Sequence, residues 1–568
     1  MKKNTLFALP FLLFFLSCKN EKTAPKTDWI LVKNGTIYNG LGGESFVGDV
    51  LIQGDTIAQM GRTGTLNLAD FKAENLKIVD ATGMAVAPGF INMLSWSTET
   101  LIEDGRSMSE IKQGITLEVM GEGNSMGPMN DSIIRESINN MGDIQYEIKW
   151  KTLGGYLDWL AKRGVSCNIA SFVGATTVRE NVLGSKNIAP TNLELEKMKN
   201  LVREAMEEGA MGVGSALIYA PGFYAKTDEL TQLCKVAAEY DGMYISHLRS
   251  EGNRLSEAVD ELISISKNAK IRAEIYHLKA AGKQNWSKMD KIIAKIDSAQ
   301  KNGLAISANM YTYIAGATGL DAAMPPSVQE GGIKEWIKRL KDEKIRKQVL
   351  KDMTTPTDKW ENLYLGASAK GTLLCGFKQD SLKYLTGKTL EEAAKIFKKS
   401  PEETAIDLVI KDGSRVEVVY FLMSEENVKK QLQLPYVSFG SDAGSQAPEG
   451  IFLKSSTHPR AYGNFARLLG KYVRDEKVLS MSEAIYKLTA LPAAHLKIKK
   501  RGTLAVGNFA DVVIFDPLSI RDNATFEKPH QLATGVKHVF VNGIQVLKTG
   551  EHTGAKPGRV VRGPGWKN

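Results

Sequence analysis

Short apolar runs alternate with amphipathic segments of helical period through the middle of the chain. The stretch 241–286 is typical: two strand-like runs, 243–248 and 271–278, flank a segment whose apolar residues recur every three or four positions. This pattern predicts a β-α-β unit, in which the two strands are parallel neighbours. Eight strands of this kind are predicted, at 84–94, 114–122, 167–174, 211–218, 243–248, 271–278, 304–311 and 437–442.

Helical patterns of suitable length fall between most of these strands, as at 192–209 and 227–240. The predicted fold class is therefore α/β, and eight parallel strands with intervening helices is the count of a (β/α)8 TIM-type barrel. An open doubly wound sheet has the same alternation, but the sequence lacks the Gly-x-Gly-x-x-Gly loop that such a fold uses to bind a dinucleotide. The long gap between the seventh and eighth strands predicts an inserted subdomain at about 325–433.

The two ends of the chain share a different pattern. Segments 29–88 and 501–568 consist of short alternating strands separated by turn residues, which predicts one composite β-sandwich around a barrel at 89–500.

The first 18 residues carry two lysines, a short apolar run and a small residue before Cys18. The run is too short to span a bilayer, so it predicts an export signal. Its end resembles a bacterial lipobox, which implies lipidation at Cys18, a polar tether at 19–28 and a membrane-anchored protein facing the periplasm or the cell surface. Plain secretion with cleavage nearby is the alternative.

Composition narrows the choice of partner. The net charge is +9, yet no Lys/Arg run with interleaved aromatic residues occurs, which argues against nucleic acid and favours a small anionic substrate. The three remaining cysteines, Cys167, Cys234 and Cys375, are odd in number and widely spaced, so we expect buried thiols rather than disulfides or a Cys-x-x-Cys metal site.

Four side chains at predicted strand ends carry the candidate chemistry. His247 and His277 end neighbouring strands, Glu122 ends the second and Asp442 the eighth. Two imidazoles and two carboxylates at one rim make a plausible site for Zn²⁺ or a similar divalent cation. Such a cation acidifies water, and we predict that Asp442 is the general base. Structural histidines and a turn aspartate are the alternatives.

Several stretches together resemble the N-acyl-D-amino-acid deacylase (D-aminoacylase) family of the amidohydrolase superfamily. They include APGFIN, ISHLRSEG, HLKAAGKQNW, GSDAG, HPRAYGNFARLLGKYV and RGTLAVGNFADVVIFDP. The resemblance implies a metal-dependent barrel with a composite sandwich. It also implies hydrolysis of an N-acyl, D-configured amino acid, or of a related amide or dipeptide.

The departures from the family pattern concern the metal. The family has His-x-His after its PGFID motif, where this chain has Leu94 and Trp96, neither of which binds a metal. The family's strand-two cysteine aligns with Glu122 if one residue is deleted, and with Gly123 otherwise. We therefore expect one zinc ion per chain, or another divalent metal, with Glu122, His247, His277 and Asp442 as the metal residues and Asp442 also as the base.

The free carboxylate of an N-acyl amino acid is expected to bind a basic side chain. Arg460 is the first candidate, and Lys279 and Arg249 are the second candidates. Arg460 paired with a structural acid is the alternative. His458 and Tyr219 are expected to line the pocket, or to be packed. Two other functions stay open: a catalytically impaired binding lipoprotein, because of Leu94 and Trp96, and hydrolysis of a cyclic amide.

Overall fold

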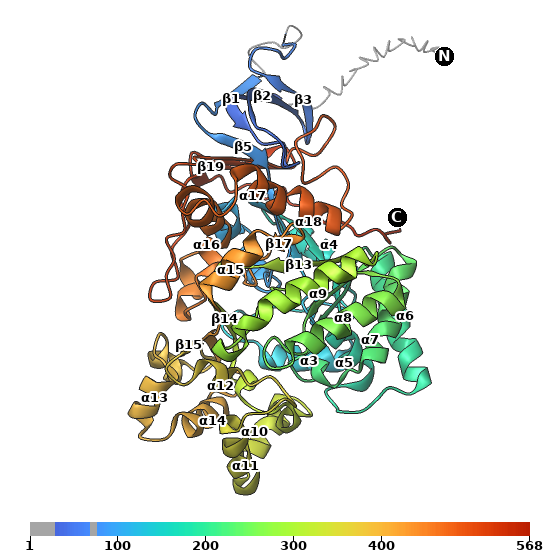
Figure 1. The fold of residues 1–568 in the computed structure, drawn as a ribbon, viewed down its shortest axis with the longest axis vertical. Coiled ribbons are helices and arrows are strands. Elements are labelled where there is room, and N and C mark those ends of the chain that lie inside the picture. Colours follow the sequence, from blue (N-terminus) through green and yellow to red (C-terminus); the bar gives the residue numbers. More distant parts are fainter. Residues whose placement is uncertain (1–28, 69–75, 568) are drawn as a thin grey trace, which may run out of the picture.

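The computed structural model describes residues 29–68 and 76–567, so the predicted signal, Cys18 and tether lie outside the described residues. The architecture is mixed α/β. Three parts follow one another along the long axis: a β-sheet at one end, a central α/β part, and a smaller, mainly helical part at the other end (Figure 1).

Parallel strands form the centre of the molecule. One sheet has the order β17-β13-β12-β11-β10-β9, and a second has the order β6-β7-β8. These two sheets contain the predicted strands, with two differences: the prediction 84–94 is divided between β5 and β6, and 167–174 is interrupted at Phe172. The bounds are β6 Phe90–Asn92, β7 Ile115–Met120, β8 Asn168–Ser171, β9 Val173–Gly174, β10 Gly212–Ala216, β11 Met243–His247, β12 Arg272–Ile275, β13 Ile306–Met310 and β17 Val437–Phe439.

Backbone hydrogen bonds also join the edges of these two sheets. The amide of Met93, just after β6, donates to Phe439 of β17 (3.0 Å). The amide of Met211, just before β10, donates to Ser171 of β8 (2.9 Å). The carboxyl ends of these strands therefore face the same side of the molecule.

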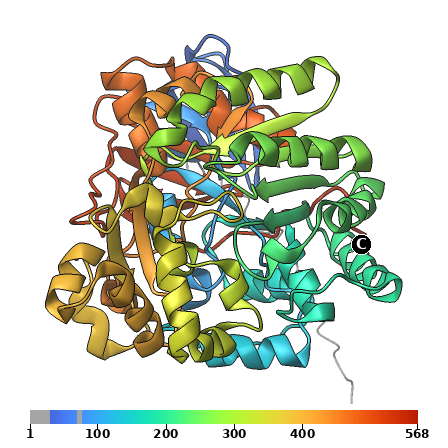
Figure 2. The ribbon, with the colours of Figure 1, turned by 60° about the horizontal axis from the view of Figure 1, so that its bottom comes forward.

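Helices pack against the outside of the strands (Figure 2). The predicted helices are confirmed as α6 and α7, and the segment between the two histidines forms α8, in which Leu255, Ala258, Val259, Leu262 and Ile265 are buried. Thr191 and Glu194 form a capping box that satisfies the first amides of α6. The bounds are α5 Ala175–Leu183, α6 Asn192–Glu207, α7 Thr227–Glu239, α8 Leu255–Ala269 and α9 Met289–Lys301.

Both chain ends contribute to one nine-stranded sheet, in which β18 pairs antiparallel with β5. Val512, Ile514, Val86 and Val32 lie in its buried core. The sheet order is β21-β20-β19-β18-β5-β1-β2-β3, with β4 beside β1. The bounds are β1 Trp29–Ile37, β2 Phe46–Gln53, β3 Thr56–Arg62, β4 Leu76–Asp80, β5 Ala85–Pro88, β18 Val512–Phe515, β19 Val536–Val541, β20 Ile544–Lys548 and β21 Glu551–His552.

The segment between β13 and β17 builds the mainly helical part. It has its own antiparallel sheet, order β14-β16-β15, and its own core, which includes Trp336, Leu340 and Ile406. This part begins with β14, earlier than the predicted boundary at 325. The bounds are β14 Ala315–Gly319, α10 Ile333–Lys341, α11 Glu343–Thr354, α12 Leu363–Ala367, β15 Thr372–Gly376, α13 Leu390–Phe397, α14 Pro401–Asp412, β16 Glu417–Phe421 and α15 Glu425–Leu432.

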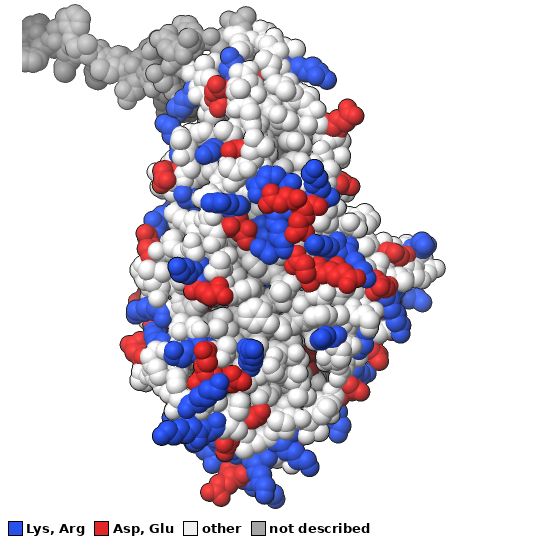
Figure 3. Space-filling model, turned by 60° about the vertical axis from the view of Figure 1, so that its left-hand side comes forward, with Lys and Arg blue, Asp and Glu red and all other residues white. Residues whose placement is uncertain are grey.

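Basic and acidic side chains are interspersed over the face shown in Figure 3. Within 29–68 and 76–567, every helix is too short or too polar to cross a membrane. Cys167, Cys234 and Cys375 are free and buried, as the sequence predicts.

Candidate metal centre

The four predicted residues all lie at the carboxyl ends of central strands. His247 is the last residue of β11. Glu122 and His277 lie two residues beyond β7 and β12, and Asp442 three residues beyond β17. All four are thus brought to the edge formed by the carboxyl ends of the central strands, which is the mouth of the site. Enzymes with parallel α/β folds position their reactive groups at this edge.

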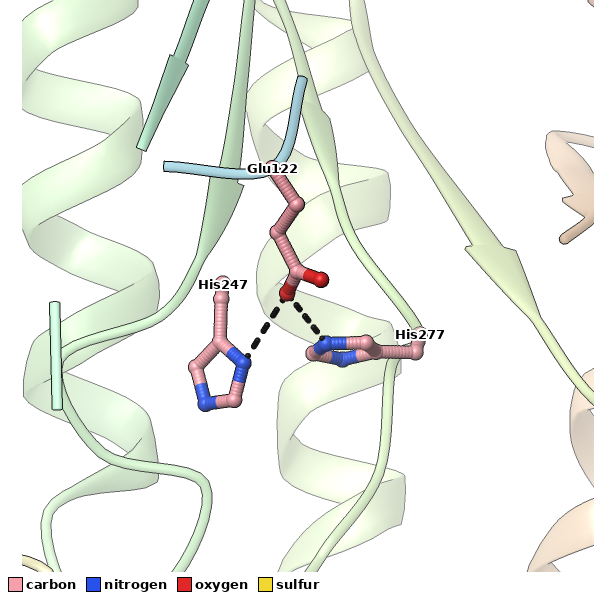
Figure 4. Close-up of side chains that lie close together, drawn as sticks. All are labelled: Glu122, His247 and His277. Atoms are coloured by element: carbon pink, nitrogen blue, oxygen red, sulfur yellow. Dashed lines mark hydrogen bonds and ion pairs between the residues drawn. The ribbon is translucent and has the colours of Figure 1, made fainter. Parts of the chain in front are cut away.

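Three of them converge on a common point. One carboxylate oxygen of Glu122, Oε1, lies 2.8 Å from His277 Nε2 and 3.1 Å from His247 Nδ1. The three possible ligand atoms all lie within 4.8 Å of one another, and the three side chains are buried. Figure 4 shows the two rings nearly perpendicular, with one oxygen of Glu122 directed between them. Glu122, rather than Gly123, therefore supplies the acid at this position.

Two glycines allow Glu122 to reach the histidines. Gly121 and Gly123 both have positive φ, 106° and 68°. A Cβ at Gly121 would lie 2.3 Å from the Phe172 carbonyl oxygen, and one at Gly123 would lie 2.6 Å from Ala216 Cβ. Any larger residue at either position would displace the loop that carries Glu122.

The backbone at two of the site residues has an uncommon conformation. His277 and Asp442 have φ values of 34° and 51°. The amide of His277 donates to Asn309 Oδ1 (2.8 Å), and Asn309 in turn donates to Glu274 (2.8 Å). Left-handed residues other than glycine concentrate at functional sites, where the surrounding structure holds them in place.

Glu251 contacts the far side of both imidazoles, and the sequence reasoning missed it. Its Oε1 lies 3.0 Å from His277 Nδ1 and accepts a hydrogen bond from Lys279 Nζ (2.6 Å), while Oε2 lies 3.6 Å from His247 Nε2. A carboxylate behind a ligating histidine fixes the orientation of the ring. Glu251 falls in an irregular loop, so no periodicity in the sequence points to it.

The pKa values follow from burial and from these charges. Burial and the Lys279 ammonium oppose protonation of His277, but the carboxylates of Glu251 and Glu122 outweigh them and raise its pKa to about 9. Burial alone would raise the pKa of Glu122, yet the two histidines hold it below its usual range. Burial raises the pKa of Asp442, against the effect of Arg460. The two carboxylates thus favour positive charge between them, at the position of His277.

Asp442, which the sequence predicts as a fourth metal residue, lies outside the set of ligand atoms that converges. Its Oδ1 accepts a hydrogen bond from Trp96 Nε1 (3.1 Å), and its Oδ2 forms an ion pair with Arg460 Nη1 (2.8 Å). The same indole N–H also donates to Glu122 Oε2 (2.9 Å). Arg460, predicted first as a substrate cation, is thus paired with an acid of the site. Trp96, expected only to lack a metal ligand, is part of the polar network.

The remaining predicted substrate residues are placed differently. Arg249 does not point into the site, because its guanidinium binds Glu261 and the carbonyls of Phe223 and Ala225. These bonds occupy four of its five N–H groups and leave one N–H of Nη1 for a ligand, so the geometry does not support Arg249 as the substrate cation.

His458 and Tyr219 are mainly packed. His458 Nδ1 accepts from the Arg460 amide (3.0 Å), so Nε2 donates to the Ala315 carbonyl (2.9 Å), and the ring serves the backbone rather than a ligand. Tyr219 lies edge-on to His247, with ring centroids 5.3 Å apart. Lys279 remains close to the ligand atoms, with Nζ 2.7 Å from His277 Nδ1.

The donor set fits a divalent transition metal. One carboxylate oxygen and two imidazole nitrogens are the ligand types of catalytic zinc sites, which keep a further position open. The second nitrogen of His277 lies 3.0 Å from Glu251 Oε1, the carboxylate partner expected behind a ligating imidazole.

The chain is similar in sequence to known amidohydrolases. A model of the amidohydrolase family matches residues 436–547. The chain is 29% identical to the D-aminoacylase of Alcaligenes xylosoxydans xylosoxydans over 94% of this chain and 97% of that protein.

Two solved structures are similar over nearly their whole length. One is a D-aminoacylase described by its binuclear metal centre, with 27% identity, coverage of 94% of this chain and 100% of that chain, and a TM-score of 0.77. The other is the N-acyl-D-glutamate deacylase of Bordetella bronchiseptica, bound to zinc and a phosphonate mimic of the tetrahedral intermediate, with 26% identity, coverage of 94% and 99%, and a TM-score of 0.75.

Proposed function

The chain belongs to the D-aminoacylase family of the amidohydrolase superfamily, and from this premise we propose that it hydrolyses the amide bond of N-acyl-D-amino acids with one divalent cation, preferably zinc. The observation that carries the proposal is the convergence of Glu122 Oε1, His247 Nδ1 and His277 Nε2 within 4.8 Å. No other group of three or more His, Cys, Asp or Glu residues in the described part of the chain meets that criterion.

We further propose that the central strands close into a (β/α)8 barrel with the metal at its mouth. The hydrogen bonds from Met93 to Phe439 and from Met211 to Ser171 support this, because they link both edges of the two parallel sheets. With β8 and β9 taken as one interrupted strand, the neighbours run β6, β7, β8/β9, β10, β11, β12, β13, β17 and back to β6. The sheet formed by both chain ends is proposed to be the composite sandwich of the family.

The cation, when bound by Glu122, His247 and His277, supplies Lewis acidity that polarises the amide carbonyl and lowers the pKa of water. Asp442 acts as the general base: it accepts a proton from the attacking water and returns it to the departing nitrogen. Each carboxylate oxygen of Asp442 has two lone pairs, so its bonds to Trp96 and Arg460 leave acceptor capacity for that proton. Its raised pKa brings it closer to the range in which it can both accept and donate.

The carboxylate of an N-acyl amino acid is proposed to bind at the basic side of the mouth. Arg460 Nε is buried and makes no hydrogen bond within residues 29–68 and 76–567, and Lys279 Nζ lies beside His277. A guanidinium with a free donor and a nearby ammonium suit a carboxylate ligand. The D configuration is proposed from the relatives, which are named as acting on D-amino acid derivatives.

Hydrolysis tests this proposal directly. Release of free amine from N-acetyl-D- and N-acetyl-L-amino acids is measured on metal-free protein with and without added Zn²⁺. We expect turnover of D-substrates that disappears with a chelator and returns with zinc. A protein that binds zinc yet releases no amine from N-acetyl-D-amino acids would instead be a binding protein, and turnover of cyclic amides alone would favour a hydantoinase-like activity.

We also propose export and lipidation at Cys18, which rests on the sequence of the first 18 residues. Cells expressing the full chain are labelled with palmitate. Label on the wild-type protein that is absent from a Cys18→Ser variant supports anchoring, and label on neither contradicts it.

A further inference from the structure

A single indole N–H lies between the buried carboxylate of Glu122 and the partly buried carboxylate of Asp442 at the mouth. Trp96 Nε1 donates to Glu122 Oε2 at 2.9 Å and to Asp442 Oδ1 at 3.1 Å. The main chain of Trp96 is held as well, because its amide donates to the Ala443 carbonyl (3.0 Å). The side chain is 39% exposed, so the ring lies at the entrance with its polar edge directed inward.

This arrangement decides which atom of Glu122 faces the histidines. Trp96 engages Oε2, and Oε1 is therefore the oxygen that lies 2.8 Å and 3.1 Å from the imidazoles. At Asp442, Trp96 engages Oδ1 while Arg460 pairs with Oδ2. One donor thus fixes the rotation of both carboxylates.

A metal ion that bridges two acids lies between two neighbouring carboxylates, as a small positive centre bound to both. The N–H of Trp96 occupies that position here. Indole nitrogen is a donor only and offers no lone pair to a metal. Leu94, two residues earlier, is fully buried and cannot ligate either.

We propose that Trp96 takes the place of a second cation: its N–H holds the outer oxygens of Glu122 and Asp442, orients Oε1 toward the histidines, and limits the mouth to one metal ion. Trp96 is thus a positioning residue. This inference rests on the proposed metal-dependent function, but it concerns the number of ions and what orders the two acids rather than the reaction itself.

The test compares Trp96→Phe with Trp96→His. Phenylalanine keeps an aromatic ring but removes the donor, whereas histidine adds a ligand nitrogen beside Glu122 Oε2 and Asp442 Oδ1. Zinc content after dialysis is measured by elemental analysis, and zinc affinity by calorimetric titration of the metal-free protein. Trp286→Phe is the matched control, since its indole donates to the Leu422 carbonyl (2.8 Å) rather than to a site carboxylate. Circular dichroism verifies that each variant is folded.

We expect one zinc per chain in the wild type and in Trp286→Phe, at equal affinity. Trp96→Phe should bind its first zinc about 10- to 100-fold more weakly, the usual effect of losing a group that orients a ligand. Trp96→His should bind two.

Two zinc ions in the wild type would overturn the inference. So would a folded Trp96→His variant that still binds one, or an unchanged affinity in Trp96→Phe. A wild-type protein that binds no zinc would instead overturn the proposed function, so the two failures are distinguishable.

Discussion

Two buried polar clusters of this molecule are built from similar residues yet differ in how fully their atoms are paired. In the cluster that joins the chain-end sheet to the central strands, Arg501 pairs with Asp511 and donates to Asn542, which donates to Asn168 (2.8 Å). Every side-chain nitrogen and oxygen of Asp511, Asn542 and Asn168 has a partner, as do both terminal nitrogens of Arg501.

At the mouth the pairing is incomplete. His247 Nε2, Arg460 Nε and Tyr311 Oη are buried and make no hydrogen bond within the described part of the chain. Three carboxylates, Glu122, Glu251 and Asp442, meet there. Because leaving a buried polar group unpaired costs free energy, an incomplete cluster indicates a place where a ligand completes the pairing. We propose that the fully paired (closed) cluster stabilises the fold and that the incompletely paired (open) cluster binds the metal ion and the substrate.

The largest expected effect is at the open cluster. His277→Ala removes one of three ligand atoms and leaves Glu122 without its closest partner. We expect stoichiometric zinc binding and amide hydrolysis both to fall below detection, measured by elemental analysis and by amine release. Full activity in this variant would contradict the role of the site.

Asp442→Asn separates catalysis from metal binding. An amide cannot accept the proton but keeps an oxygen for the Trp96 N–H, so kcat should fall about 10²- to 10⁴-fold, the usual contribution of a general base. Zinc content should stay at one per chain, because Asp442 lies outside the converging set. Loss of the metal would show instead that Asp442 is a ligand.

The closed cluster should respond in the opposite way. Arg501→Met leaves the buried carboxylate of Asp511 without its cation, so the free energy of unfolding should fall by about 3–5 kcal/mol. Zinc affinity, and kcat/KM at a temperature where the variant stays folded, should not change. Denaturant unfolding and the hydrolysis assay measure the two quantities on the same preparation.

The smallest effect concerns a fourth acid near the mouth. Burial raises the pKa of Glu361 to about 7, although a hydrogen bond from Ser250 (2.6 Å) opposes the shift. The folded state therefore binds this proton more tightly than the unfolded state, in which the pKa is about 4.3. The resulting stabilisation is fully present below about pH 4.3 and is lost as the pH rises through about 7.

Glu361→Gln should abolish that part of the pH dependence. Between pH 5 and 8 the free energy of unfolding should fall in both proteins, but by about 1–2 kcal/mol less in the variant. This difference allows for the partial solvent exposure of Glu361. The free energy of unfolding is measured in urea at several pH values. The same dependence on pH in Glu361→Gln and in the wild type would contradict this.

The sequence predicted the parts of the fold that depend on periodicity. The apolar positions of α8, among them Leu255, Val259 and Leu262, are buried as their spacing requires. His247 and His277 come together because two consecutive parallel strands end at the same edge. Glu122 was identified only through the family resemblance and the strand count.

The missed features depend on loops and on side-chain direction. Glu251 and Trp96 follow strands in irregular segments, where no repeat indicates which way a side chain points. Arg249 was predicted to hold the substrate carboxylate, but it lies in the loop after β11, where Glu261 engages its guanidinium. The early start of β14 follows from pairing with β16, a contact across about 100 residues that no local pattern encodes.

The most direct test of the account is an anomalous difference map at the zinc edge from crystals of zinc-loaded protein. We predict one peak per chain, within bonding distance of Glu122 Oε1, His247 Nδ1 and His277 Nε2. A map without a peak at these three atoms would contradict the central claim.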